Sequence, residues 1–223
     1  MKTREHGFTL IEIAIVLVII GLLLGGVLKG QELITGARVR NLIGQQDGIK
    51  AAYFGFLDRY RALPGDYKNA TTTIQGVSAG SDGNGDGVIG DAAPATIKES
   101  IAAWEHLAKA GFINGSYTYA ATQTDASNPM NPFGSFIQLT HDGAYGGAGA
   151  PAQVRPNLKT GDRIPVEILA EVDRKVDDGL PNSGSFRSST YGSPDATCLD
   201  ATPTPNVWKG TSGASSCSAA TLF

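Results

Sequence analysis

Residues 7–28 read GFTLIEIAIVLVIIGLLLGGVL and form a long apolar stretch near the start of the chain. From Phe8 to Leu28, 21 residues contain a single ionisable side chain, that of Glu12. An α-helix rises about 1.5 Å per residue, so about 20 apolar residues cross the hydrocarbon core of a bilayer. The stretch therefore predicts a membrane-spanning helix over residues 8–28.

Residues 1–7, MKTREHG, form a short basic leader ahead of this stretch. Lys2 and Arg4 are expected to hold the leader in the cytoplasm and to direct the rest of the chain across the membrane. A removable secretory signal and a plain membrane anchor are the simpler interpretations. A secretory signal has a shorter apolar region followed by a small-residue cleavage site. Because the apolar stretch continues to Leu28, retention of the helix is favoured over its removal.

Glu12 is the feature that a plain anchor leaves unexplained. A carboxylate in the apolar part of a membrane helix costs about 2.5–3.5 kcal/mol on insertion scales, and such residues usually have a function. If the chain were cut after Gly7, a new α-ammonium group would be created on Phe8, also within the membrane. The buried cation of one subunit and the buried anion of the next would neutralise each other in a staggered helix pair. We therefore expect Glu12 to set the register of a polymer.

The run from Gly7 to Glu12, with a basic leader before it and an apolar helix after it, resembles the class III signal of type IV pilins and type II secretion pseudopilins. In that family a prepilin peptidase cuts after the glycine and methylates the new amino terminus. The resemblance implies that Gly7 is the cleavage residue, Phe8 the modified amine and Glu12 the assembly carboxylate. The resemblance is strongest over residues 1–35, and beyond them it extends only to the general architecture of the chain.

The helix is predicted to continue past the membrane as an amphipathic segment, residues 29–63. Pro64 ends it, because proline disfavours helical geometry in the residue before it. A helix over residues 8–63 would be about 84 Å long at 1.5 Å per residue. Apolar side chains recur on one face of the segment at three-, four- and seven-residue steps, the spacing of a helix that packs against protein: Leu42, Ile49, Ala52, Tyr53, Phe56, Tyr60 and Leu63.

Residues 64–223 are expected to form a loop-rich head. Apolar spacing predicts helices over residues 96–112 and 162–178, and residues 135–140 have the composition of a β-strand. By resemblance to the pilins, the fold class is α+β. The long N-terminal helix, transmembrane in its first half and amphipathic in its second, packs on a small antiparallel sheet.

The loop of residues 82–91, DGNGDGVIGD, matches the first eight positions of a calcium-binding EF-hand loop. The glutamate expected at position twelve is replaced by Ala93, so Asp91 or Glu99 would have to complete the shell. An incomplete shell predicts a structural site with weak affinity, on the order of 10⁻⁴–10⁻³ M. A turn without metal is the alternative. The predicted Ca²⁺ ligands are the side chains of Asp82, Asn84, Asp86 and Asp91 and the carbonyl of Val88.

The two cysteines, Cys198 and Cys217, lie near the C-terminus of a head that is predicted to be exported. Bonded to each other, they would close a loop of about 20 residues and stabilise the fold by about 3 kcal/mol in the chain-entropy model. Two free thiols are the alternative. Type IV pilins commonly carry such a C-terminal disulfide loop and the major pseudopilins commonly lack one, so the resemblance favours a pilin.

Composition argues against several other classes of protein. The net charge of −3 argues against a basic face that would neutralise many phosphates, so no nucleic acid is indicated. Three histidines and two cysteines leave little from which to build a zinc site. A membrane-anchored enzyme is a further alternative, but the sequence contains no catalytic constellation, and we expect no enzymatic activity.

The resemblance implies a structural subunit of a type IV pilus-like filament, with a type II secretion pseudopilin as the alternative. Its implied partners are copies of itself, other pilins, a prepilin peptidase, an inner-membrane platform protein and an assembly ATPase. Before assembly the chain would cross the inner membrane once, with its head in the periplasm. After assembly it would lie in an extracellular pilus or a periplasmic pseudopilus.

Overall fold

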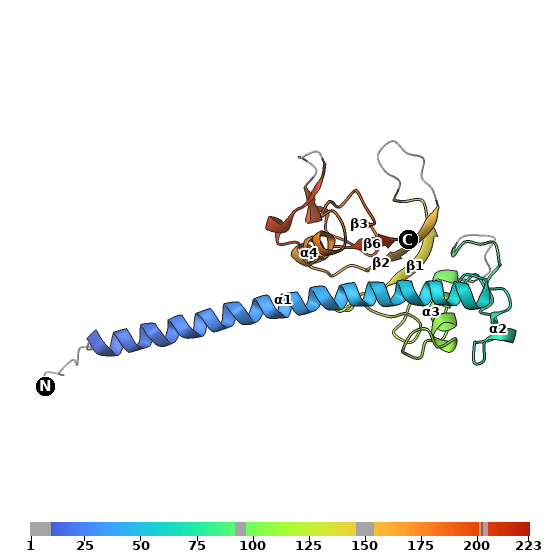
Figure 1. The fold of residues 1–223 in the computed structure, drawn as a ribbon, viewed down its shortest axis with the longest axis horizontal. Coiled ribbons are helices and arrows are strands. Elements are labelled where there is room, and N and C mark those ends of the chain that lie inside the picture. The colour runs from blue at the N-terminus through green and yellow to red at the C-terminus, as the bar shows by residue number, and fades with distance from the viewer. Residues whose placement is uncertain (1–9, 92–96, 146–153, 201, 203–204) are drawn as a thin grey trace, which may run out of the picture. The chain divides into compact units, whose positions relative to one another are not determined.

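The computed structural model describes residues 10–91, 97–145, 154–200, 202 and 205–223 (Figure 1). Its first element is α1, Leu10–Tyr60, a helix of 51 residues. Contacts within the chain define two compact units, Met1–Arg38 and Val39–Phe223. Helix α1 supplies residues to both units.

In the first unit, α1 exposes its apolar side chains. Its large aliphatic residues from Leu10 to Ile34 are between 47% and 93% exposed. An 18-residue window of α1 has a mean hydropathy of 2.8 and none of its residues is buried. Among the described residues, α1 is the one helix long and apolar enough to cross a membrane. An apolar surface of this extent needs lipid or other apolar helices around it.

In the second unit, α1 buries the predicted apolar stripe. Tyr60 and Leu63 are partly buried and pack against the apolar core that contains Phe56. The helix ends at Tyr60, three residues earlier than predicted, because Arg61 takes a left-handed conformation with φ 53°. The Arg61 N–H donates to the Leu57 carbonyl at 2.9 Å and closes the last turn. The buried residues of α1 are Val39, Leu42, Gln46, Ile49, Ala52, Tyr53 and Phe56.

A four-stranded antiparallel sheet confirms the predicted α+β class. Its strands are β1 (Gln138–Asp142), β2 (Arg155–Lys159), β3 (Phe186–Ser188) and β6 (Ala219–Leu222), in the order β1-β2-β6-β3. The register pairs Leu139 with Leu158, and Thr221 of the C-terminal strand with both Leu158 and Phe186. The strand predicted over residues 135–140 is therefore present but starts three residues later.

The remaining elements are short. The predicted helices are α3 (Glu99–Lys109) and α4 (Val166–Val176), and α2 (Ala70–Thr73) was not predicted. Thr96, the first residue of the helix predicted over residues 96–112, lies outside the described residues. A second sheet pairs β4 (Leu199–Asp200) with β5 (Val207–Trp208), between the 3-10 turns η1 (Ala196–Cys198) and η2 (Gly210–Ser212).

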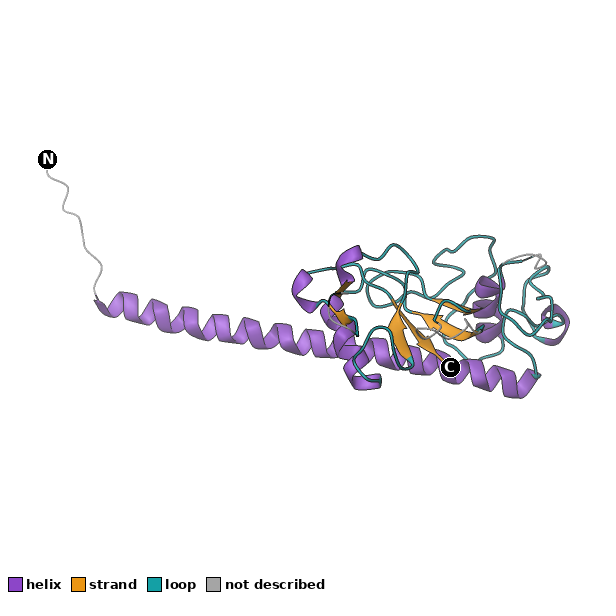
Figure 2. Cartoon of the chain, turned by 90° about the horizontal axis from the view of Figure 1, so that it is seen from above, coloured by secondary structure: helices purple, strands orange, loops and turns teal. Residues whose placement is uncertain are grey.

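Two apolar cores join α1 to the sheet and to the other helices. Figure 2 shows the C-terminal part of α1 running alongside the strands of the second unit. In one core, Val39 and Leu42 pack with α4 and with Phe186 of β3. In the other, Phe56 packs with Trp104 of α3 and with the inner residues of β1 and β2. The α1 segment after Arg38 is therefore an integral part of the head, which explains its amphipathic sequence.

Candidate functional site

The first candidate site is the beginning of α1. Glu12 lies in the first turn of α1 and is the one ionisable residue between Leu10 and Leu28. The flanking side chains of Ile11 and Ile13 are 68% and 47% exposed. The carboxylate is therefore carried by a helical surface that is otherwise apolar. Gly7 and Phe8 lie outside the described residues.

The second candidate site is the loop of residues 82–91, part of which folds around the buried carboxylate of Asp66. Asp66 is 4% exposed, and its carboxylate accepts three backbone hydrogen bonds, from Gly85 at 2.7 Å, Asp86 at 3.0 Å and Gly87 at 2.9 Å. Burial raises the pKa of Asp66, and these three hydrogen bonds oppose the rise. Three consecutive backbone N–H groups of the loop therefore point at the Asp66 carboxylate.

Glu99, in the first turn of α3, holds the two ends of the same loop. It is 0% exposed and accepts hydrogen bonds from the N–H of Asn84 at 3.0 Å and of Gly90 at 2.9 Å. Burial raises the pKa of Glu99; these hydrogen bonds oppose the rise, and the negative charges of Asp66 and Asp86 add to it. Two buried acids from different parts of the chain therefore fix the path of the loop.

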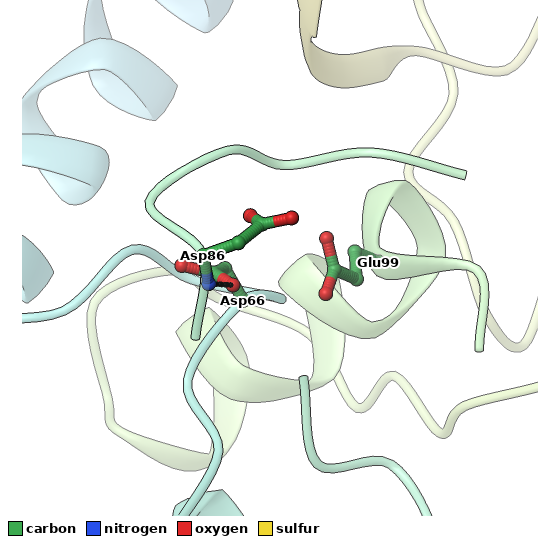
Figure 3. A group of neighbouring side chains, drawn as sticks. All are labelled: Asp66, Asp86 and Glu99. Atoms are coloured by element: carbon green, nitrogen blue, oxygen red, sulfur yellow. Dashed lines mark hydrogen bonds between the residues drawn. The ribbon is translucent and has the colours of Figure 1, made fainter. Parts of the chain in front are cut away.

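Asp86, at the exposed tip of the loop, completes a group of three carboxylates. One oxygen of each of Asp66, Asp86 and Glu99 lies within 4.8 Å of the other two. Figure 3 shows the carboxylates of Asp86 and Glu99 directed toward each other. Like charges at this distance repel, and oxygen ligands of this type are those that Ca²⁺ prefers. The three side chains therefore fit a hard divalent cation.

Two further residues of the predicted ligand set contact Asp86; Val88 does so through its N–H, whereas its carbonyl was the predicted ligand. The Asn84 side chain donates to the Asp86 carboxylate at 2.9 Å and accepts from the Asp86 N–H at 2.8 Å. The Val88 N–H donates to the other oxygen of Asp86 at 2.9 Å. Residues 84–88 thus form the compact turn that the alternating Asn and Asp residues suggested.

Asp82 and Asp91 are directed to other partners. Asp82 accepts hydrogen bonds from the N–H of Thr71 at 2.8 Å and from its hydroxyl at 2.6 Å, at the start of α2. Asp91 accepts from the N–H of Ser100 at 3.0 Å and from its hydroxyl at 2.7 Å, at the start of α3. Both aspartates stabilise the first turn of a helix, a common role for a carboxylate.

Asp66 is the residue of this group that the sequence analysis missed. It lies 20 residues before Asp86, and no regular spacing relates the two. The one local hint is Gly65, which has a φ of +87° and is so close to α3 that an added Cβ would lie 2.2 Å from the Glu99 carbonyl oxygen. The N–H of Gly65 also donates to the buried His106 ring at 2.9 Å. Burial lowers the pKa of His106, so the ring is a neutral packing group.

The third feature is the C-terminal loop closed by a disulfide. Cys198 and Cys217 are bonded, with their Cα atoms 5.8 Å apart, which confirms the predicted pairing.

At the end of α4, Asp177 accepts hydrogen bonds from the N–H of Ser185 and, at 2.9 Å, of Phe186. Asp178 accepts from the N–H of Leu180 at 2.9 Å. These acids at the C-terminus of α4 therefore hold the loop that follows it.

Comparison with known proteins identifies the N-terminal region. A family described as the prokaryotic N-terminal methylation motif matches residues 2–28. This motif is typical of type IV pilins and pseudopilins, and the matched segment contains Gly7, Phe8 and Glu12. No curated protein and no solved structure matches the chain. The chain therefore carries a prepilin-type signal in front of a membrane-compatible helix.

Proposed function

We propose that this protein is a structural subunit of a type IV pilus-like filament. A prepilin peptidase cuts the chain after Gly7 and methylates the amine of Phe8. The observation that carries the proposal is the match of residues 2–28 to the methylation motif, directly followed by an apolar helix whose side chains are exposed. Such a helix is suited first to lipid and then to a bundle of like helices.

In the proposed filament, Glu12 of one subunit meets the Phe8 amine of a neighbour. Charges are costly in an apolar bundle, and one stagger of the two helices brings the carboxylate and the amine together. The pairing therefore favours a single register. The apolar contacts supply most of the association energy, and the charge pair selects the stagger.

The proposed partners follow from this assembly. They are other copies of the chain, other pilins, the prepilin peptidase, an inner-membrane platform protein and an assembly ATPase. Before assembly the head lies in the periplasm and the helix of residues 8–28 crosses the inner membrane. The proposed divisions are a leader (1–7), a polymerisation helix (8–28), an amphipathic continuation (29–63) and a globular head (64–223).

A type II secretion pseudopilin is the second candidate. The disulfide between Cys198 and Cys217 favours a pilin, because type IV pilins commonly carry such a C-terminal disulfide loop and the major pseudopilins commonly lack one. Deletion of the gene separates the two candidates. We expect loss of surface filaments with normal secretion; intact filaments with cargo retained in the periplasm would instead identify a pseudopilin.

We further propose that the acidic loop binds a structural Ca²⁺ ion. The support is the convergence of Asp66, Asp86 and Glu99 within 4.8 Å, two of them buried. From the sequence-based ligand set, Asp86 is retained, with Asn84 and Val88 beside it. Asp82 and Asp91 brace the neighbouring helices in this proposal. The ion would offset the repulsion among three carboxylates and hold the loop in place.

A further inference from the structure

The chain contains two asparagines that are directly followed by glycine, Asn84 and Asn114. In such a pair the backbone nitrogen of the glycine can attack the side-chain amide carbon of the asparagine, because glycine has no Cβ to obstruct the approach. Both asparagines are exposed to solvent. The dipeptide is the same at the two positions, so any difference in reactivity arises from the contacts that each one makes in the fold.

The reaction is a deamidation and needs only water. The glycine nitrogen loses its proton and forms a bond to the side-chain amide carbon, which closes a cyclic succinimide. The side-chain nitrogen takes up a proton and leaves as ammonia. Water then adds to one carbonyl carbon of the ring and breaks its bond to the ring nitrogen, which yields aspartate or isoaspartate. The product carries a new carboxylate, and no atom is oxidised or reduced.

At Asn84 the fold opposes this reaction. The N–H of Gly85 donates to the Asp66 carboxylate at 2.7 Å and to the Asp66 carbonyl at 3.0 Å. The amide oxygen and nitrogen of the Asn84 side chain are both bonded to Asp86, at 2.8 Å and 2.9 Å. Loss of the Gly85 proton would break its hydrogen bonds and place a negative nitrogen against a carboxylate. Hydrogen bonding to the protonated form and a nearby like charge both disfavour ionisation.

At Asn114, in the segment that follows α3, these restraints are absent. Within the described part of the chain, no hydrogen bond holds the side-chain amide of Asn114 or the N–H of Gly115. Asn114 lies at a pocket whose lining residues include no Asp, Glu, Lys, Arg or His. The glycine nitrogen can therefore lose its proton without breaking a hydrogen bond, and no carboxylate of the pocket lining opposes the loss.

We propose that Asn114 is a site of deamidation in the folded protein and that the acidic loop protects Asn84 from the same reaction. The modification places a negative charge beside a pocket whose lining is otherwise uncharged. The inference does not depend on filament assembly or on bound calcium.

The first test compares the two positions in one sample. The full chain is incubated in detergent at mildly alkaline pH, and peptide mapping by mass spectrometry measures the product at each asparagine. We expect Asn114 to react at least about tenfold faster than Asn84, because the reaction at Asn84 must break hydrogen bonds. In guanidinium chloride, where the contacts with Asp66 and Asp86 are lost, the two rates should converge. Equal rates in the folded chain, or a faster reaction at Asn84, would overturn the proposal.

The second test uses a pair of matched variants. Asn114→Gln keeps an amide at the position but lengthens the side chain, so ring closure is slow and the product at residue 114 should disappear. Asn182→Gln makes the same change at another exposed asparagine, one that is followed by serine, and should leave the reaction at Asn114 unchanged. Melting temperatures show that both variants are folded. An undiminished gain of negative charge in Asn114→Gln, measured by isoelectric focusing, would place the main reaction elsewhere and contradict the assignment.

Discussion

The indole N–H of Trp208 donates a 2.6 Å hydrogen bond to the carboxylate of Asp173. Asp173 lies on α4 and is 0% exposed, and Trp208 lies in the segment that the disulfide closes. Burial raises the pKa of Asp173 to about 6, although the hydrogen bonds from Trp208 and Gly179 oppose the rise. The disulfide-closed loop is therefore joined to α4 through an acid whose ionisation depends on pH near neutrality.

This pKa predicts that stability depends on pH in a definite direction. The folded state holds the Asp173 proton more tightly than the unfolded chain, where the pKa is about 3.9. The stabilisation is complete below about pH 4 and is lost as the pH rises through about 6. Asp173→Asn should remove this dependence. Relative to the variant, the wild type should lose about 1–3 kcal/mol of unfolding free energy between pH 4.5 and pH 7.5.

Urea unfolding of the full chain in detergent at both pH values measures this difference. Burial also raises the pKa of Asp66 and Glu99, but these groups are present in both proteins and their effect cancels in the comparison. Parallel pH profiles for the two proteins would contradict the assignment to Asp173.

Loss of the disulfide should destabilise the head. The bond joins residues 19 apart in sequence, and its removal by the double change Cys198→Ser and Cys217→Ser should lower the unfolding free energy by about 3 kcal/mol. Calorimetry measures the shift. A reductant should lower the melting temperature of the wild type and leave the double variant unchanged. Equal melting temperatures for the two proteins would show that the loop is held mainly by its other contacts, including the Trp208 bond.

Glu12→Ala should leave cleavage after Gly7 intact and prevent polymerisation. The peptidase would still meet the glycine and the apolar helix, but the amine of the neighbouring subunit would lack its counter-charge. Mass spectrometry of the N-terminus and electron microscopy of sheared filaments measure the two outcomes. Asp58→Ala, a change of an exposed acid on the same helix, is the control and should assemble normally. Normal filaments from Glu12→Ala would exclude the charge-pair mechanism.

Calcium should stabilise the head through Asp86. At a free concentration of 100 times the dissociation constant, a bound ion adds about 2.7 kcal/mol. With a dissociation constant on the order of 10⁻⁴–10⁻³ M, this requires about 10–100 mM free Ca²⁺. Asp86→Asn should abolish the rise in melting temperature that Ca²⁺ causes. Asp82→Asn should keep this rise but lower the melting temperature measured without Ca²⁺, because Asp82 accepts a hydrogen bond from Thr71. A response lost in Asp82→Asn as well as in Asp86→Asn would favour the ligand set predicted from sequence, and a response kept in Asp86→Asn would contradict the calcium proposal.

Gly83→Ala should destabilise the acidic loop by at least about 1–3 kcal/mol. An added Cβ at Gly83 would lie 2.2 Å from the backbone of Asp66, so one of the two segments would have to move. Gly90→Ala is the control, since an added Cβ at this glycine in the same loop meets nothing within 4 Å. Thermal unfolding compares the two variants, and equal effects would show that the packing of the loop on Asp66 is loose.

Long-range contacts limited what the sequence predicted about the head. The stripe from Leu42 to Phe56 was predictable because helical periodicity is a local property of the chain. The end of α1 was displaced by three residues because Arg61 takes a left-handed conformation that propensity does not foresee. Asp66 was missed because its role depends on backbone N–H groups about 20 residues away.

The chain by itself determined the features that depend on neighbours in sequence: the prepilin-type signal, the apolar helix with one acid and a glycine-rich acidic turn. The α+β class was expected from the family resemblance. Tertiary structure alone decided which carboxylates converge. Asp66 lies in the segment after α1 and Glu99 lies at the start of α3, and both come close to Asp86 only in the folded chain. It also decided that Trp208 meets Asp173. The physical reason is that burial and like-charge proximity arise only when distant segments pack, and no local pattern encodes those distances.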